Sequence, residues 1–182
     1  PPIFASGKHF VQLYHWQTSH TQERYVKYCA PNPINMNFCE ISKKYFDEWV
    51  LMGVALWPHH TKQEIAKEFS ELLSLKKYAT FLCLNETGKP IAFINLSLRH
   101  DYVEGATRSP VAYVEGIYVK TQNRKQGVAK ELIKIAEQWA KKQGCKELAS
   151  DAELRNVDSQ KFHKNLGFKI ADTIVHFIKE VQ

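Results

Sequence analysis

Two patterns of apolar and polar residues follow one another along this chain from residue 36 onward. Short apolar or alternating runs bounded by turn residues are typical of strands, and they occur at Asn37–Ile41, Ala79–Leu84, Ile91–Leu98, Val111–Val119, Leu148–Asp151 and Phe168–Ile178. Apolar residues three and four positions apart indicate amphipathic helices, which we expect at 43–56, Lys62–Leu75, Val128–Gln143 and Val157–Leu166.

Residues suited to helix ends support these boundaries. Ser42 is a suitable N-cap for the first helix, and Thr61 with Glu64 has the spacing of a capping box for the second. Gly144 and Gly167 are placed to end the last two helices. The predicted order is β-α-α-β-β-β-α-β-α-β. It favours an α/β (mixed α+β) fold with a central mixed sheet of about six or seven strands and helices on both faces.

The first part of the chain differs from the rest. Residues 1–35 show no clear periodicity, and Pro31 and Pro33 punctuate their end. We therefore predict an N-terminal extension of unknown role, native or not, followed by one folded domain at 36–182 that begins at Met36. An upstream read-through, a cloning remnant and a genuine extension would each explain such a segment.

Composition and charge limit the classes of partner. The chain has 182 residues, of which 44% are hydrophobic and 24% charged, an ordinary globular composition. No apolar run approaches the length of a membrane span, and the N-terminus lacks the basic and apolar blocks of a secretory signal. The formal net charge of +6 is spread along the chain and suits an anionic ligand such as CoA. No aromatic-plus-basic motif indicates nucleic-acid binding, so we expect no nucleic acid and no membrane among the partners.

The cysteines indicate a reducing compartment and no metal site. Cys29, Cys39, Cys83 and Cys145 show no CxxC spacing, so we expect no bound metal. Cys83 and Cys145 lie in apolar contexts and are interpreted as reduced core residues. A cytoplasmic location is the default for such a protein.

A strand, a loop and a helix in the second half of the chain predict an anion site. The apolar run Val111–Val119 leads through a basic, Gly-containing loop into the helix at Val128. A helix N-terminus presents unpaired N–H groups and a positive dipole end. Arg124 and Lys125 add charge, and Gly127 with Ala129 leaves room for a ligand near the backbone. Such a place holds a phosphate or pyrophosphate, although a plain surface turn before an amphipathic helix is the alternative.

Two motifs resemble the signatures of one enzyme superfamily. Arg124-x-x-Gly127-x-Ala129 after a strand resembles the acetyl-CoA pyrophosphate loop of the GNAT superfamily of N-acetyltransferases. The second resemblance is to Asn-x-x-Ala-x-x-Phe-Tyr-x-x-x-Gly-Phe, which begins here at Asn156. Two positions depart from it, because Ser159 replaces Ala and His163 replaces Tyr. The resemblance implies the GNAT fold and acetyl-CoA as co-substrate.

Further segments of 36–182 resemble a narrower family, the bacterial aminoglycoside 6'-N-acetyltransferases. They are Trp57, Tyr102 to Pro110, Tyr113 to Val119 and Ala149-Ser-Asp151. The resemblance implies acetyl transfer to the 6'-amine of an aminoglycoside, antibiotic resistance as the result, and a homodimer. Residues 1–35 find no counterpart in it.

Two carboxylates are candidates for work on the acceptor amine. An aminoglycoside amine is largely ammonium near neutral pH, and a nearby carboxylate binds it and accepts its proton. Asp151, at the end of a short strand, is our candidate base; a helix-cap or turn aspartate is the alternative. Glu115 lies inside an apolar strand, where an ionised carboxylate needs a partner. We expect it to bind the aminoglycoside; pairing with a basic neighbour on the outer face is the alternative.

The resemblance also assigns the residues that hold acetyl-CoA. Backbone N–H groups after Gly116, at Tyr118 and Val119, would bind the thioester carbonyl as an oxyanion site. Asn156 would contact the pantetheine arm, a role compatible with capping a helix. The expected cofactor-binding residues are Ile117, Tyr118, Val119, Arg124, Lys125, Gln126, Gly127, Val128, Ala129, Lys130, Asn156, Phe162 and Lys164.

The remaining candidates are one acid and a group of cleft residues. His163 replaces a tyrosine that can protonate the leaving thiolate, and an imidazole can do the same near neutral pH; the alternative is a residue that only lines the CoA channel. If His163 is inert, water or the product ammonium supplies the proton. Trp57, Asp101, Tyr102 and Glu104 would line the sugar-binding cleft, although core packing is the alternative for Trp57. No cysteine occupies a motif position, so we favour direct attack in a ternary complex.

Two other functions stay open at this point. One is a GNAT enzyme for another amine, such as a polyamine, a protein N-terminus or a lysine, because its CoA loop would be the same. The other is a non-catalytic CoA-binding sensor. Turnover of acetyl-CoA separates an enzyme from a sensor, and the choice of acceptor separates the two enzymes.

Overall fold

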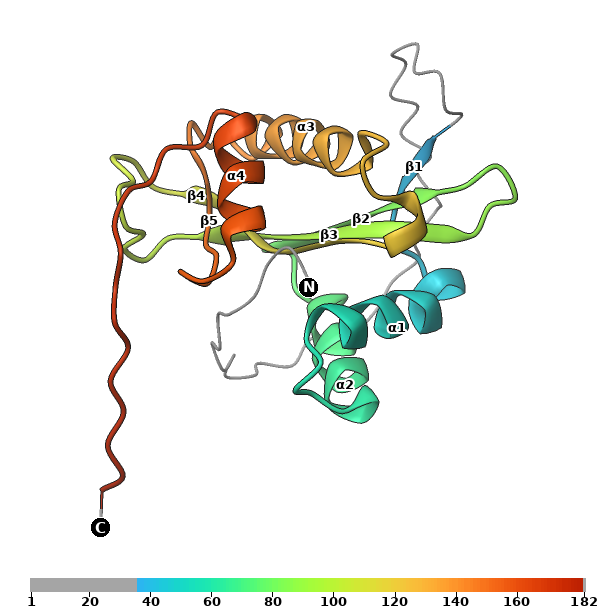
Figure 1. Cartoon of the computed structure of the whole chain (residues 1–182), viewed down its shortest axis with the longest axis horizontal. Helices are drawn as coiled ribbons and strands as arrows, with labels where there is room; N and C mark the ends of the chain where they lie inside the picture. Colours follow the sequence, from blue (N-terminus) through green and yellow to red (C-terminus); the bar gives the residue numbers. More distant parts are fainter. Residues whose placement is uncertain (1–35, 182) are drawn as a thin grey trace.

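The computed structural model describes residues 36–181, which form one mixed sheet with helices on both faces (Figure 1). The strands are β1 (Asn37–Glu40), β2 (Tyr78–Leu84), β3 (Pro90–Arg99), β4 (Val111–Val119) and β5 (Leu148–Ser150). The helices are α1 (Phe46–Leu56), α2 (Lys62–Leu72), α3 (Val128–Lys142) and α4 (Val157–Asn165), and short 3-10 turns lie at Lys43–Tyr45 and Thr121–Asn123.

The sheet has the order β1-β2-β3-β4-β5. The first four strands are antiparallel, and β5 runs parallel to β4. Helices α1 and α2 lie on one face, and α3 and α4 lie on the other (Figure 1). Because a right-handed crossover joins parallel neighbours, α3 is the connection that brings β5 beside β4. The predicted mixed fold, with helices on both faces, is confirmed.

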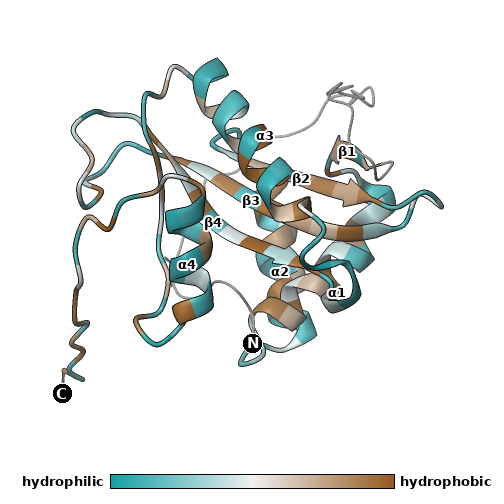
Figure 2. Cartoon of the chain, turned by 45° about the horizontal axis from the view of Figure 1, so that its top comes forward, coloured by the Kyte–Doolittle hydropathy of each residue, from teal (hydrophilic) through white to brown (hydrophobic). Residues whose placement is uncertain are grey.

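The core lies on both faces of the central strands, where brown apolar segments of β2 and β3 run between the helices (Figure 2). Between α1 and α2, Trp49 stacks on Phe69 with the ring centroids 3.9 Å apart. The indole N–H of Trp49 donates to Asn95 Oδ1 at 3.1 Å, and Thr80 donates to the same oxygen at 2.9 Å. Asn95 is buried in β3, so these bonds satisfy a polar group that would otherwise cost stability.

Most predicted elements are confirmed, with ends shifted by a few residues. The capping box at Thr61 and Glu64 forms in both directions. Ser42 makes no side-chain cap, and a 3-10 turn precedes α1. The second helix ends at Leu72 rather than Leu75, because the chain turns there toward β2. Cys83 and Cys145 are buried reduced thiols as predicted, and burial raises the pKa of Cys83 to about 12.

The predicted last strand, Phe168–Ile178, is wrong, so the described residues hold five strands rather than six or seven. This segment is extended but leaves the body of the protein (red, Figure 1). A strand needs a neighbour for its backbone groups, and alternation alone does not supply one. The exposed apolar residues are Ile170, Ile174, Val175, Phe177, Ile178 and Val181.

Two further results concern chain organisation. The predicted extension at residues 1–35 lies outside the described residues. Within 36–181, none of the helices has the length and apolar character needed to cross a membrane.

Candidate active site

A bulge in β4 shapes the centre of the site. Val114 faces Leu96 and Gly116 faces Asn95 across the β3–β4 ladder, so Glu115 is an extra residue on β4. A bulge bends the strand and re-aims the side chains beside it. Here it places Glu115 on the same face of the sheet as Ser97, whose hydroxyl donates to its carboxylate.

Strand β4 loses its outer neighbour at the same point. β5 pairs with β4 only from Ala112 to Val114, so no other strand of residues 36–181 pairs with the outer edge of β4 beyond the bulge, and we call this the open edge. The Lys120 N–H donates to Ile91 O on β3 at 2.9 Å. Because donors alternate in an antiparallel ladder, the N–H of Tyr118 also points to β3. Those of Ile117 and Val119 therefore point to the open edge.

Trp57 lies over this part of β4 at the end of α1. A Cβ on Gly116 would lie 2.7 Å from the Trp57 ring, so only glycine allows this approach. The ring also packs edge-on against Phe69, at 6.1 Å between centroids. Trp57 is half-buried. Trp57 therefore packs against the core, the alternative considered from sequence, and its place in a sugar-binding cleft stays a prediction.

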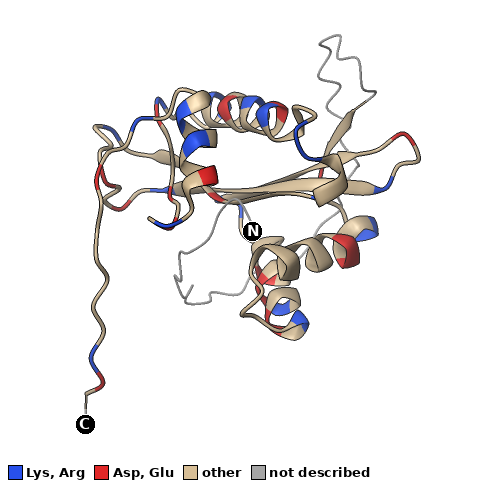
Figure 3. Cartoon of the chain, in the orientation of Figure 1, with Lys and Arg blue, Asp and Glu red and all other residues tan. Residues whose placement is uncertain are grey.

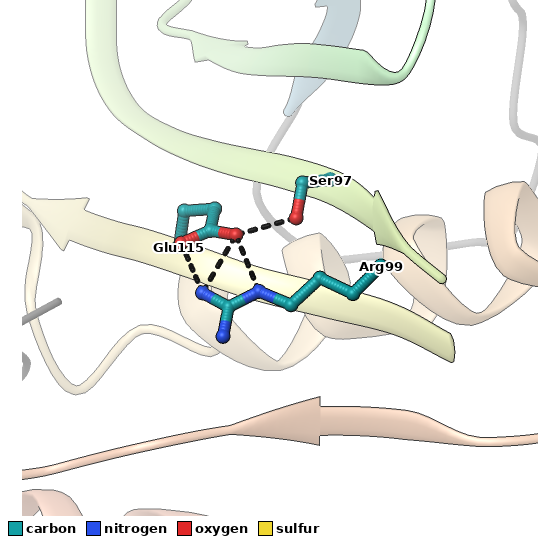
Figure 4. Close-up of polar contacts among 3 residues, drawn as sticks. All are labelled: Ser97, Arg99 and Glu115. Atoms are coloured by element: carbon teal, nitrogen blue, oxygen red, sulfur yellow. Dashed lines mark hydrogen bonds and ion pairs between the residues drawn. The ribbon is translucent and has the colours of Figure 1, made fainter. Parts of the chain in front are cut away.

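Glu115 is held by an arginine from the neighbouring strand (Figure 4). Arg99 Nη2 donates to both carboxylate oxygens of Glu115, at 2.9 and 2.7 Å, and Arg99 Nε donates to Oε1 at 3.0 Å. Both side chains are about one-quarter exposed, at 25% and 24%. Burial opposes the charge of Arg99, but the bonds and charge of Glu115 outweigh it and raise the arginine pKa. Glu115 therefore has the basic neighbour named as the alternative from sequence.

Asp151 belongs to the same cluster. The Arg99 guanidinium carbon lies 3.3 Å from the centre of the Tyr113 ring, and the Tyr113 side chain interacts with the Asp151 carboxylate. Asp151 follows β5 and keeps an exposed surface. Partial desolvation by the surrounding protein raises the pKa of its carboxyl; Arg99 opposes this rise, and Glu115 adds to it. A carboxyl with a raised pKa beside an open strand edge suits a general base.

The loop before β4 carries the other acceptor-side candidates. Asp101, Tyr102 and Glu104 are all exposed, and the interaction with Glu104 raises the pKa of Tyr102. The loop is tied to the start of β5 by Glu147. The carboxylate of Glu147 accepts bonds of 3.0 and 3.1 Å from two loop N–H groups and one of 2.7 Å from a loop hydroxyl.

The loop before α3 has the geometry expected of an anion site. Gly127 is the N-cap of α3 with φ 83°, and no side chain caps the helix. Glycine is favoured there because L side chains rarely adopt such a φ. Lys125 also has a positive φ, 61°. Arg124 Nε donates to Val119 O at 3.0 Å, and Gln126 donates to a carbonyl of the loop at 3.2 Å. The loop therefore presents basic side chains beside a helix N-terminus that no side chain of residues 36–181 caps.

Lys and Arg also recur along α3 and α4 (blue, Figure 3). Val128 is buried and anchors the start of α3, whereas Ala129 is half-buried and Lys130 is exposed. This basic side of the sheet lies opposite the face that carries the Glu115 cluster. The charge distribution therefore separates a surface for an anionic ligand from one for a cationic ligand.

Helix α4 carries the remaining candidates. Asn156 is its N-cap and accepts from the Ser159 N–H at 3.1 Å. Phe162 packs against the core, and Lys164 is exposed. His163 Nε2 lies 3.0 Å from Ser150 Oγ, and its Nδ1 lies 2.8 Å from a carbonyl oxygen of its own helix. Burial lowers the pKa of this imidazole.

Sequence reasoning missed four residues of the site. These are Ser97, Arg99, Tyr113 and Ser150, which contact Glu115, Asp151 or His163. A signal was present for the first two, because a serine and an arginine lie among the apolar residues at the end of this strand. Both lie on one face of β3, since residues two apart share a face.

Comparisons with known proteins show the family of this chain. The sequence profile of the acetyltransferase (GNAT) family matches residues 37–168. The aminoglycoside N(6')-acetyltransferase type 1 of Serratia marcescens is 41% identical over 133 residues, 73% of this chain and 91% of that protein. The protein of the same name from Acinetobacter genomosp. 13 is 37% identical over 146 residues, 80% of this chain and 99% of that protein.

Solved structures of the same kind superimpose on the fold. AAC(6')-Iy in complex with the bisubstrate analogue CoA-S-monomethyl-acetylneamine matches with a TM-score of 0.76 at 35% identity, over 81% of this chain and 99% of that chain. The aminoglycoside antibiotic 6'-N-acetyltransferase AAC(6')-Ih from Acinetobacter baumannii matches with the same TM-score and identity, over 81% and 100%. These matches confirm the family resemblance drawn from the two motifs. The chain belongs to the acetyltransferase (GNAT) family and, within it, to the aminoglycoside N(6')-acetyltransferases.

Proposed function

We propose that this protein transfers the acetyl group of acetyl-CoA to the 6'-amine of aminoglycoside antibiotics and thereby confers resistance. The observation that carries the proposal is the pair of carboxylates, Glu115 and Asp151, beside the open edge of β4. An acetyl donor along that edge would face an acidic surface suited to a polycation. The similar proteins described above carry this acetyl transfer in their names.

The pyrophosphate of CoA would bind at the loop before α3. The N–H groups of Val128, Ala129 and Lys130 would point at it, since no side chain caps this helix. The loop from Arg124 to Gly127 would supply charge and close backbone approach. Along the arm of CoA the proposed contacts are Ile117, Tyr118, Val119, Asn156, Phe162 and Lys164.

The aminoglycoside would bind on the opposite side of β4. Glu115 and Asp151 would take its ammonium groups, and Trp57 would meet a sugar ring. The exposed loop residues Asp101, Tyr102 and Glu104 would complete the cleft. Because Glu115 is already paired with an arginine, most of the uncompensated negative charge would come from Asp151 and the loop.

The chemistry then needs one base and one oxyanion site. Asp151 would accept a proton from the ammonium, and the freed amine would form a bond to the acetyl carbon while the carbon–sulfur bond breaks. The N–H groups of Ile117 and Val119 on the open edge would stabilise the charge on the carbonyl oxygen. The ladder supports Ile117 over Tyr118 for this role. Direct attack in a ternary complex requires no acetylated side chain.

The leaving thiolate must take up a proton. We propose His163 as its source, acting through the Ser150 hydroxyl that its Nε2 faces. The lowered pKa of His163 favours the neutral ring near pH 7. The thiolate could therefore also take the proton that Asp151 received from the substrate. The two sources predict a different dependence of kcat on pH.

Release of free thiol from acetyl-CoA tests the function. Kanamycin, spermidine and a lysine peptide serve as parallel acceptors, and the mass of the product counts the acetyl groups. Turnover with kanamycin alone, with one acetyl added, supports the proposal. Turnover only with spermidine or the peptide would mean that the enzyme acetylates another class of amine. Acetyl-CoA binding without turnover would indicate a sensor.

Assembly and location complete the proposal. We propose a homodimer in which the exposed apolar segment 169–181 of each copy is covered by the other. β5 is an edge strand and offers it a neighbour. We place the enzyme in the cytoplasm, where acetyl-CoA is available and where the reduced thiols of Cys83 and Cys145 are stable.

A further inference from the structure

We propose that Tyr113 and Arg99 are positioning residues that hold the Asp151 carboxylate in place for the transfer reaction. The inference rests on the proposed role of Asp151 as the base. It adds two residues that sequence analysis did not single out. The connection runs through one face of the sheet, from Glu115 through Arg99 and Tyr113 to Asp151.

The geometry gives Tyr113 a fixed place beside Asp151. Tyr113 lies opposite Ser97 on β3 and Ala149 on β5, so strands on both sides hold its backbone. The residue is only 7% exposed. Asp151 follows Ala149 by two residues, the spacing that puts two side chains on one face of a strand, and its carboxylate interacts with Tyr113. Because the backbone of Tyr113 is part of the sheet, this interaction positions a side chain that would otherwise rotate at the end of β5.

Arg99 fixes the ring of Tyr113 in turn. The guanidinium lies flat enough on the ring for its carbon to be 3.3 Å from the ring centre. The same guanidinium also donates to both carboxylate oxygens of Glu115. A planar fork that binds a carboxylate and stacks on an aromatic ring is specific to arginine. Arg99 therefore couples the orientation of Glu115 to that of Tyr113.

Tyr113 remains a hydrogen-bond donor throughout the working pH range. Burial raises its pKa, and the charge of Asp151 raises it further. A hydroxyl that donates to a carboxylate stabilises the ionised form. The charged and titratable groups that face Asp151 are therefore Arg99 from β3 and Tyr113 with Glu115 from β4. Arg99 and Tyr113 lower its pKa, and Glu115 raises it.

The sign of each substitution follows from these effects. A base must be ionised, so a higher pKa of Asp151 moves the acidic limb of kcat/KM to higher pH. Tyr113→Phe removes a donor to the ionised form and should move this limb up by roughly 0.5 to 1 pH unit. Arg99→Gln should move it in the same direction. Glu115→Gln removes a negative charge and should move it down.

The decisive experiment measures kcat/KM for kanamycin against pH in these variants. For Tyr113→Phe we expect the upward shift, a kcat several-fold lower, and an unchanged KM for acetyl-CoA. Tyr45→Phe is the matched control, since it removes a phenol hydroxyl from the 3-10 turn before α1. Arg99→Lys keeps the charge but loses the fork, so it should lower kcat while leaving the limb near that of the wild type. For Tyr113→Phe and Arg99→Gln, a purely structural role would lower activity without moving the limb, and that result would contradict the proposal.

Two outcomes overturn different claims. If Asp151→Asn is inactive but Tyr113→Phe has the kcat and pH profile of the wild type, the positioning role is wrong and the proposed base stands. If Asp151→Asn retains full activity, the base assignment itself fails. Circular dichroism and acetyl-CoA binding of each variant show whether the fold is intact, and Tyr113→Phe keeps the ring that packs under Arg99.

Discussion

His163 Nε2 lies 3.0 Å from Ser150 Oγ, so a side chain of α4 is bonded to the last residue of β5. The Nδ1 atom lies 2.8 Å from the carbonyl oxygen of Ser159. A carbonyl only accepts, so Nδ1 carries the proton, and in the neutral ring Nε2 accepts from the Ser150 hydroxyl. This contact places an imidazole and a hydroxyl on the face of the sheet that α4 covers, at the residue that precedes Asp151.

Replacing His163 with Gln tests the proposed proton donor. If the imidazole protonates the thiolate, kcat should fall about tenfold or more, with little change in the KM for acetyl-CoA. A donor must be protonated, and burial lowers the His163 pKa. In the wild type, kcat should therefore decline as pH rises past a pKa below the usual histidine value, and His163→Gln should lack this decline. An unchanged kcat and profile would assign the proton to Asp151 or water.

Replacing Asp151 with Asn tests the proposed base. The amide has nearly the same shape but takes up no proton, so kcat/KM for kanamycin should fall by about 10² to 10⁴. Acetyl-CoA affinity should be unchanged, because Asp151 lies apart from the α3 loop. In the wild type, the raised pKa of Asp151 places the acidic limb above the usual aspartate value. Steady-state rates from pH 4 to 9 measure both the loss of kcat/KM in the variant and the acidic limb of the wild type. A variant as active as the wild type contradicts the role of Asp151 as the base.

Glu147 should set the position of the acceptor loop. Its carboxylate accepts from Thr107 N–H and hydroxyl and from Arg108 N–H, and the bonds to Thr107 are the main cause of its lowered pKa. Glu147→Ala leaves these donors without their acceptor, so the loop should lose its fixed position. We expect the KM for kanamycin to rise several-fold while kcat and the KM for acetyl-CoA stay within about twofold.

A matched control separates this effect from general loss of charge. Glu137→Ala removes an exposed carboxylate from α3 and should leave all three constants unchanged. Equal acceptor KM values in the wild type and the Glu147 variant would show that the loop holds its position without this anchor. A parallel rise in the KM for acetyl-CoA would indicate a wider disturbance of β5.

Local chemistry made part of this structure predictable. The hydrogen bonds of the Thr61–Glu64 capping box, 2.8 and 3.3 Å long, need only the residues of one helical turn. The same holds for the Asn156 cap and for Gly127, whose φ of 83° suits glycine. The apolar run of β4 and the spacing of α3 identified the strand–loop–helix unit, because both periods reflect burial against one sheet.

Long-range pairing was not predictable from spacing. The Arg99–Glu115 pair joins residues 16 positions apart, and its geometry depends on the register of two strands. The bulge that places both Glu115 and Gly116 on one face is likewise a property of the ladder. Tyr113 lies inside an apolar run, so its sequence context indicates core packing. Only the approach of β5 turns its hydroxyl into a partner for Asp151.

The failure of the last predicted strand leads to a test of assembly. Alternation in 168–178 shows that the segment suits a strand, but no strand within 36–181 pairs with it. Phe177 and Ile178 are 92% and 100% exposed, an arrangement that a second copy would relieve. Sedimentation of the wild type should therefore give about twice the 21.1 kDa of the chain.

Charges placed in that segment should separate the two copies. In a covered interface an unpaired carboxylate costs several kcal/mol, so Phe177→Asp combined with Ile178→Asp should give a monomer at micromolar concentration. Lys179→Ala is the control and should stay dimeric. Ala171 packs against Gly105 in the acceptor loop, so loss of the partner should also raise the KM for kanamycin more than that for acetyl-CoA. A dimeric double variant would exclude this segment from the interface, and a monomeric wild type would exclude the dimer altogether.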